Sequence, residues 1–448
     1  MSAKKNHDHV FYRNPNKYYP TVDRGEGVYI YDTDGKQYLD GSGGAAVVLI
    51  GHGIKEIRQA MLEQAERISF THGTHFTSEP AMKLADKLTA MAPSRLNRVY
   101  FVSGGSEAVE TAVKMARQYQ VDRGAGTKFK VISRWTSYHG NTLGALALSG
   151  HTGRRKYHQP LLKHTPHIAP AYCYRCPFGS EPDKCCLECA EDLEKTILYE
   201  GPDSVSAFIA EPVVGATAGA LVPPPGYFPR IREICDKYDV LLISDEVMTG
   251  LGRTGKNFAI DHWSEPDMIV CAKGLGSGYT PLYCVISDEK IHSSIQAGTG
   301  NFIHGFTYGQ NPQSCAVGLA VLNYIEKNNL ISRSVRLGSY LLDRLKSLLQ
   351  HPVVGDVRGL GLFSGVEFVR DRKTKEPFDP KMKVNALIAG RAFEMGLVTY
   401  PGSGGADGIR GDHILIAPPF IITEDQIDFL VSTLDAAIGE ITREHNLA

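Results

Sequence analysis

The 448-residue sequence lacks several features that would assign it to a specialised class of protein. Its formal net charge is −1, so no basic bias points to nucleic acid and no acidic tail is present. No apolar run approaches the ~18 residues of a membrane-spanning helix, and the polar residues 1–13 contain no apolar segment of a secretory signal. These absences predict a cytoplasmic enzyme that binds neither nucleic acid nor membrane.

The cysteines lack the pattern of a secreted disulfide framework, because their number, nine, is odd. Five of them lie between Cys173 and Cys189, where Cys-x2-Cys is followed by Cys-Cys-x2-Cys. This spacing is that of a structural zinc knuckle, and the alternative is a thiol-rich surface insertion without metal. The sequence leaves both interpretations open, and we assign no metal to the active site predicted below.

Apolar, strand-like runs alternate with segments of helical spacing between about residues 60 and 320. The expected strands are 97–102, 129–133, 205–210, 240–244, 266–272 and 282–287, and the expected helices include 54–67, 79–92, 226–238 and 312–327. Such alternation favours an α/β fold with a doubly wound, mostly parallel sheet.

The chain divides into three predicted parts. Residues 1–60 form an arm and a hairpin around the turn at Asp34 and Gly35, and we expect this part to pack with the small domain. Residues 61–325 form the large domain. Residues 326–448 form a smaller α+β domain, in which mixed strands precede a final helix that Thr423 begins with a capping box.

Two charged residues follow neighbouring predicted strands of the large domain. The buried strand 240–244 ends at Asp245, and the run 266–272 ends at Lys273 beside a glycine-rich turn. Open α/β sheets bind ligands at the carboxyl ends of their strands. A desolvated lysine is a usable amine nucleophile, and a carboxylate is the partner that a pyridinium nitrogen needs. The pair suggests pyridoxal phosphate chemistry, although an ordinary ion pair at a sheet edge gives the same pattern.

Two further segments match the needs of a phosphorylated ring. Residues 103–106, Ser-Gly-Gly-Ser, join a strand to a helix, where backbone amides bind phosphate. Neither a Walker lysine nor a dinucleotide fingerprint is present, so a single phosphate is expected. Tyr138 follows the next strand and could stack on a ring, whose other face Val247 could cover. Taken singly, these residues also suit a tight turn, a loop and a strand.

Together the segments resemble the class III aminotransferases, the fold-type I pyridoxal phosphate enzymes, nearly from end to end. The matching segments are Ser-Gly-Gly-Ser-Glu-Ala at 103–108, Tyr-His-Gly at 138–140, Glu-Pro-Val at 211–213, Asp-Glu-Val at 245–247, Phe-Thr-Tyr-Gly at 306–309 and the context of Lys273. The resemblance implies a large domain with a mostly parallel sheet and a smaller α+β domain. It also implies that pyridoxal 5′-phosphate is the cofactor.

The resemblance implies a role for individual residues. Lys273 would hold the cofactor as a Schiff base and then move a proton, and Asp245 would keep the pyridine nitrogen protonated. Thr307 would reach the phosphate in the neighbouring subunit of a homodimer or a tetramer. The remaining predicted cofactor contacts are Gly105, Ser106, Tyr138, His139, Glu211 and Val247.

The expected reaction is a ping-pong transfer of an amino group from an ω-amino acid or primary amine to an oxo acid such as pyruvate. Arg410 is the candidate for binding the oxo-acid carboxylate, in a bidentate fork. Ala46 stands where the ω-amine branch often has a bulky residue, which implies a roomier pocket. The same scaffold also supports an amino-acid epimerase, a decarboxylating transaminase, an ammonia lyase or a pyridoxal-binding regulator without turnover.

Overall fold

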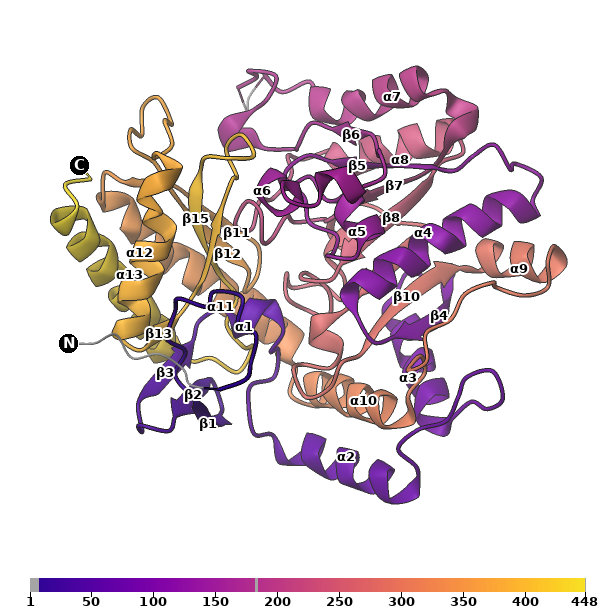
Figure 1. Cartoon of the computed structure of the whole chain (residues 1–448), viewed down its shortest axis with the longest axis horizontal. Coiled ribbons are helices and arrows are strands. Elements are labelled where there is room, and N and C mark those ends of the chain that lie inside the picture. Colours follow the sequence, from indigo (N-terminus) through magenta and orange to yellow (C-terminus); the bar gives the residue numbers. More distant parts are fainter. Residues whose placement is uncertain (1–7, 182–183, 448) are drawn as a thin grey trace.

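A computed structural model describes residues 8–181 and 184–447, whose strands form three sheets. Residues 1–7 of the predicted N-terminal arm lie outside the described part. Figure 1 shows the large sheet flanked by helices on one side of the molecule, with the N-terminal hairpin beside the C-terminal helices on the other. In the described part of the chain, no helix is both long and apolar enough to cross a membrane.

The large sheet has seven strands in the order β4-β10-β9-β8-β7-β5-β6. Their bounds are β4 Leu96–Val102, β5 Lys130–Arg134, β6 His167–Ile168, β7 Val205–Ala210, β8 Leu241–Glu246, β9 Met268–Cys271 and β10 Tyr283–Asp288. The pairs β6-β5, β5-β7, β7-β8 and β8-β9 are parallel, which confirms the predicted mostly parallel sheet. The sequence did not predict that β10 runs antiparallel to β4 and β9. Because no long crossover helix separates β9 from β10, the chain returns in the opposite direction.

Helices cover both faces of this sheet, so its central strands are buried on both sides. Leu242 of β8 packs in one hydrophobic core, while Leu241 and Ile243 pack in another on the opposite face, as the alternation of side chains along a strand requires. The helices of this region are α2 Lys55–Arg67, α3 Glu79–Met91, α4 Gly105–Asp122, α5 Leu143–Leu148, α6 Thr152–Arg155, α7 Glu188–Glu200, α8 Tyr227–Lys237, α9 Glu289–Ala297 and α10 Pro312–Lys327.

Two four-stranded sheets combine the remaining parts of the chain. The first contains β1 Val22–Glu26, β2 Tyr29–Asp32, β3 Gln37–Asp40 and β13 Leu397–Val398, and the second contains β11 Val354–Gly359, β12 Ser364–Phe368, β15 Asp412–Ile416 and β14 Tyr400–Ser403. Strands β2 and β3 form the predicted hairpin, and β13 pairs with β3, so the two ends of the chain share a sheet.

Three helices complete the C-terminal part: α11 Leu330–Leu345, α12 Val384–Glu394 and α13 Glu424–Glu444. The capping box predicted at the start of α13 is present, because Thr423 accepts the amide hydrogen of Gln426 and the Gln426 side chain accepts that of Thr423.

One buried arginine joins the large sheet to the other parts. Arg253 donates from Nη1 to the carbonyls of Leu362 and Pro418, at 3.2 and 2.5 Å, and from Nη2 to the carbonyl of Val48 at 3.2 Å. Burial lowers the pKa of Arg253 to about 9. Its hydrogen bonds therefore connect three segments that are far apart in the sequence.

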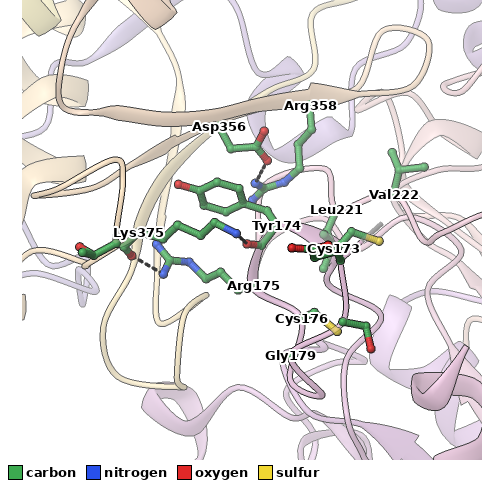
Figure 2. Close-up of a pocket in the computed structure, with 13 residues that line it drawn as sticks. Cys173, Tyr174, Arg175, Cys176, Gly179, Leu221, Val222, Asp356, Arg358 and Lys375 are labelled. Carbon is green, nitrogen blue, oxygen red and sulfur yellow. Dashed lines mark hydrogen bonds and ion pairs between the residues drawn. The ribbon is translucent and has the colours of Figure 1, made fainter. Parts of the chain in front are cut away.

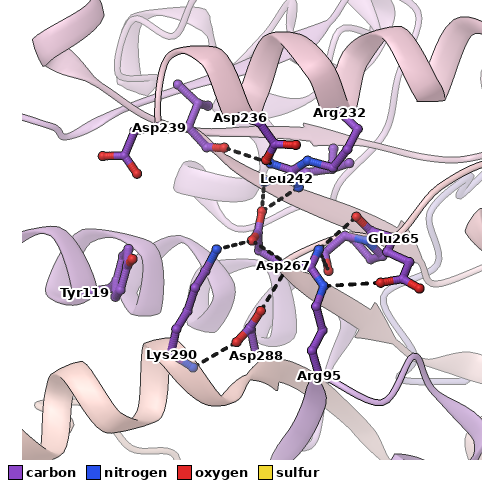
Figure 3. A network of polar contacts seen from close by, with 12 residues as sticks. Arg95, Tyr119, Arg232, Asp236, Asp239, Leu242, Glu265, Asp267, Asp288 and Lys290 are labelled. Atoms are coloured by element: carbon purple, nitrogen blue, oxygen red, sulfur yellow. Dashed lines mark hydrogen bonds and ion pairs between the residues drawn. The ribbon is translucent and has the colours of Figure 1, made fainter.

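A polar network holds the amino-terminal end of β9 (Figure 3). The buried Asp267 accepts from Arg232 Nη1 at 2.7 Å, Lys290 Nζ at 2.5 Å, the Leu242 amide at 2.7 Å and, more weakly, Arg95 Nη1 at 3.5 Å. Burial alone would raise the pKa of Asp267, but Arg232 and Lys290 hold it below its usual value. The network thus ties β8, α8 and α9 to one strand end.

Candidate active site

A cavity of about 190 Å³ lies at the carboxyl ends of the parallel strands. It is lined by Gly105, Ser106, Tyr138, His139, Gly140, Glu211, Asp245, Val247, Met248, Lys273 and Tyr283. The structure therefore brings together eight of the predicted site residues around one space. It does not bring Ala46, Thr307 or Arg410 to the lining of this cavity.

Asp245 is held in one orientation at the end of β8. Its buried carboxylate has Oδ2 2.7 Å from Nδ1 of His139 and accepts the Val247 amide through Oδ1 at 3.1 Å. Because a carboxylate only accepts hydrogen bonds, the histidine Nδ1 carries the hydrogen. The other ring nitrogen, Nε2, is buried and has no hydrogen-bond partner among the described residues. The hydrogen bond from His139 thus fixes the orientation of the Asp245 carboxylate.

Lys273 lies two residues beyond β9, in a backbone conformation unusual for a side-chain-bearing residue. Its φ is 43°, in the left-handed region, and such strain persists where the surrounding structure imposes it. Nζ donates to the carbonyl of Ala45 at 2.9 Å. Burial lowers the pKa of Lys273 to about 8, although Asp245 and Glu211 oppose the shift. The amine is therefore partly unprotonated near neutral pH.

Ala45, whose carbonyl accepts the hydrogen bond from Lys273, belongs to the glycine-rich segment after β3. This segment forms the short irregular helix α1, Gly43–Ala46. Ala46 is buried with a φ of 58° and packs beside Val213 and Met248. Its predicted effect on substrate size stays a prediction.

The amino terminus of α4 faces the same cavity with its first amides open. The N-cap residue, Gly104, provides no side-chain hydrogen bond to them. A Cβ on Gly105 would meet no atom closer than 3.5 Å, so room remains above this turn. Gly140 packs against it: its φ is 137°, and a Cβ there would lie 2.5 Å from Ser106 Oγ. Open amides at a helix terminus form an anion site, which suits one phosphate group.

Glu211, directly after β7, holds the backbone on two sides of the cavity. Oε1 accepts the amide of Tyr138 at 3.0 Å, and Oε2 accepts that of Gly215 at 3.1 Å. Burial raises the pKa of Glu211. Its immediate effect is to fix where Tyr138 lies.

Arg154 is a neighbour of the cavity that the sequence did not identify. Its guanidinium carbon lies 4.1 Å from the ring centroid of Tyr138, and Nη2 donates to the hydroxyl of Tyr400 in β14 at 3.2 Å. Arg154 belongs to α6, which has four residues. A helix this short shows no periodicity, so no sequence signal places Arg154 here.

Two predicted residues lie elsewhere on the surface. Thr307 is exposed. Arg410 is exposed, and its guanidinium forms ion pairs with Asp407 at 2.7 Å and with Glu376 at 2.9 Å. These two carboxylates already neutralise Arg410, and its proposed contact with substrate stays a prediction.

Glu246, the residue after Asp245, supports the segment after β8. Its buried carboxylate accepts the Ile260 amide at 2.8 Å and the hydroxyl of Thr249. Burial raises the pKa of Glu246 to about 7. The two carboxylates at the end of β8 therefore differ in function: Asp245 faces the cavity, and Glu246 faces the protein.

The cysteine-rich segment lies beside a separate cavity of about 740 Å³ (Figure 2). Cys173 and Cys176 line it, and next to them Lys375 Nζ donates to the Tyr174 carbonyl at 2.7 Å. Between residues 8 and 447, leaving aside 182–183, no three His, Cys, Asp or Glu side chains are placed to hold a metal ion. All nine cysteines are free thiols.

Comparisons with known proteins agree over nearly the whole chain. The family model "Aminotransferase class-III" matches residues 11–438. The chain is 41% identical over 427 residues to YodT, an uncharacterized aminotransferase of Bacillus subtilis, covering 95% of this chain and 96% of that one. It is 37% identical over 414 residues to the putrescine–pyruvate aminotransferase of Pseudomonas aeruginosa, covering 92% and 88%. An omega-transaminase structure from Thermomicrobium roseum matches with a TM-score of 0.90 at 36% identity, covering 97% and 96%.

Proposed function

The chain belongs to the class III aminotransferases, and from that premise we propose that it transfers an amino group from an ω-amino acid or primary amine to an oxo acid such as pyruvate. Enzymes of this class have the type I fold and use pyridoxal phosphate. The putrescine–pyruvate relative, by its name, pairs a diamine with pyruvate, which supports this choice of donor and acceptor.

The residues of the cavity fit this cofactor. The open amino terminus of α4 at Gly105 and Ser106 would hold its phosphate, and the Tyr138 ring would lie along its plane. Asp245 is the fixed acceptor that a protonated ring nitrogen requires, and Lys273 supplies the amine. When bound, the cofactor withdraws electrons from the carbon that carries the amino group, so that this carbon can lose a proton.

Lys273 moves that proton in the proposed reaction. Its Nζ would accept the proton from the substrate carbon and deliver it to C4′ of the cofactor, since return to the same carbon would transfer no amino group. This requires an amine that is neutral in part near pH 7. Burial provides this by lowering the pKa of Lys273 to about 8. The carbonyl of Ala45 holds Nζ in the cavity, and His139 holds the Asp245 carboxylate where it would accept from the ring nitrogen.

The observation that carries this proposal is that Asp245, Lys273 and the open terminus of α4 meet in one cavity. The test mixes the cofactor-loaded protein with pyruvate and taurine, β-alanine, γ-aminobutyrate, a diamine or an aryl amine, and measures alanine. Alanine formation that disappears in Lys273→Ala is the expected result. If the donor is racemised without alanine formation, the protein is an epimerase, and if it is deaminated without alanine formation, the protein is an ammonia lyase. Release of carbon dioxide would identify a decarboxylating transaminase.

The proposed enzyme works as a homodimer in which Thr307 reaches the phosphate of the partner's cofactor. Large apolar side chains near Thr307 are exposed on the single chain, including Ile303 at 71% and Tyr308 at 63%. Phe70 meets Tyr308 with a ring separation of 5.5 Å, so residues from two segments form one apolar patch. Light scattering should give twice the mass of the chain, or four times if dimers pair, and a monomer at working concentration would contradict this.

A further inference from the structure

Arg154 carries a positive charge beside the cavity and is not neutralised by any residue that the structure describes. Its Nη2 donates to the Tyr400 hydroxyl, and no described Asp or Glu forms an ion pair with it. The side chain is partly buried. Partial removal of a charge from water is costly unless a counter-charge compensates. A binding site for an anion that arrives from solution would explain this arrangement.

The position of Arg154 connects it to the reacting residues. Its guanidinium lies over Tyr138, which lines the cavity together with Lys273. Its charge also reaches Lys273, where it contributes to lowering the pKa of the amine. An anion bound to Arg154 would therefore lie at the Tyr138 side of the cavity, within the electrostatic reach of Lys273.

The guanidinium is held on a fixed support. His151, just before α6, has Nε2 3.0 Å from the carbonyl of Ser403 in β14, and its Nδ1 accepts the Arg154 amide. The contact with Tyr138 restrains the plane of the guanidinium, and Tyr400 restrains one of its edges. An arginine restrained in this way loses little freedom when it binds a carboxylate with two parallel hydrogen bonds.

We propose that Arg154 determines specificity for carboxylate-bearing substrates, by binding the carboxylate of the oxo acid and of any amino-acid donor, with Tyr400 as the residue that positions it. This inference rests on the proposed transaminase function and names the residue that recognises its acceptor. It replaces Arg410 in that role, because Arg410 is already paired with Asp407 and Glu376.

The test compares substrates with and without a carboxylate group in Arg154→Gln. A lost charge-assisted hydrogen-bond pair corresponds to roughly a 10- to 100-fold rise in KM for pyruvate and a similar fall in kcat/KM for β-alanine. The rate of single-turnover conversion of the cofactor by an aryl amine without a carboxylate should change by less than about twofold. Arg154→Lys should restore part of the affinity, since it keeps the charge but not the fork. Lys156→Gln, an equal loss of charge on an exposed side chain, is the matched control.

Equal losses for neutral and carboxylate substrates would show that Arg154 only supports Tyr138, and would overturn the inference. A selective loss in Arg410→Gln but not in Arg154→Gln would overturn it in favour of Arg410. Calorimetric titration with propionate, an inert carboxylate, separates the inference from the proposed function. If no amine and pyruvate pair gives alanine but Arg154→Gln weakens propionate binding, the function fails and the carboxylate site stands. If alanine forms but propionate binds both proteins equally, the carboxylate site fails.

Discussion

Replacing Asp267 by asparagine tests whether the two ends of β9 have separate functions. The wild-type carboxylate accepts from Arg232, Lys290 and the Leu242 amide while it is 1% exposed. Asparagine keeps one acceptor but turns an NH₂ group toward these donors, which leaves the Arg232 side chain, 16% exposed, without its buried counter-charge. Breaking a buried ion pair from one side costs about 3–5 kcal/mol of the free energy of unfolding. Lys273 lies beyond the opposite end of β9, so catalysis in the folded variant should stay within about twofold.

The measurement is urea unfolding of the cofactor-free proteins, followed by circular dichroism. With a slope of roughly 3 kcal/mol per M, the midpoint should fall by about 1 M or more. Asp236→Asn is the matched control, because Asp236 pairs with the same Arg232 at 2.8 Å but its side chain is 68% exposed. An exposed pair contributes about 0–1 kcal/mol, so this midpoint should hardly move.

The pH dependence follows from the lowered pKa of Asp267. A carboxyl group whose pKa is lower in the folded state adds stability above its unfolded pKa and loses it as the pH falls through the folded value. The difference between wild type and Asp267→Asn should therefore stay constant from pH 6 to 8 and shrink in acid. Equal midpoint shifts for the two variants, or a loss of alanine formation in folded Asp267→Asn, would refute the reasoning.

Three further predictions address other parts of the molecule. Gly140→Ala would place a Cβ 2.5 Å from Ser106 Oγ, so thermal melts should show about 1–3 kcal/mol of destabilisation. Absorbance titration of this variant should show a weaker affinity for pyridoxal phosphate. Gly124→Ala, also at positive φ but with no atom within 4 Å of the added Cβ, should keep that affinity. Thr423→Ala removes the cap of α13 and should cost about 1 kcal/mol in the same melts, whereas an unchanged melt would show that the cap contributes nothing. The rate of pyridoxal phosphate uptake by the cofactor-free protein should rise with pH through about 8, because the neutral amine of Lys273 reacts; a rise only near its ordinary value of 10.5 would contradict the effect of burial.

The sequence predicted the chemistry at β8 and β9 because both strands are short apolar runs that end at charged residues. Apolar runs of strand length show where a buried strand stops, and therefore where Asp245 and Lys273 emerge. They carry no information on strand direction, so the reversal of β10 could not be predicted. The strand pattern alone leaves Asp245 and Glu246 equivalent, and the choice of Asp245 rests on the family resemblance; the packing around them shows which carboxylate faces the cavity.

Contacts between distant segments account for what the sequence missed at the site. Ala45 and Lys273 are far apart in the chain, as are Arg154 and Tyr400, and no local pattern records either pair. The ion pair of Arg410 with Glu376 likewise joins two loops that no local pattern connects. Thr307 reaches no part of the cavity within its own chain, and its predicted role depends on a second copy.

The hydrogen bonds of Arg253 have a consequence for how the protein is made. Synthesis proceeds from the amino terminus, and domains generally fold in that order. The buried guanidinium nevertheless needs the carbonyls of Leu362 and Pro418, which follow Arg253 by 109 and 165 residues in the chain. Until both have been made, Arg253 has only the carbonyl of Val48 among its three acceptors. The region around Arg253 should therefore stay incompletely packed until residue 418 has been made, and a chain truncated near residue 325 should be a poor independent folding unit.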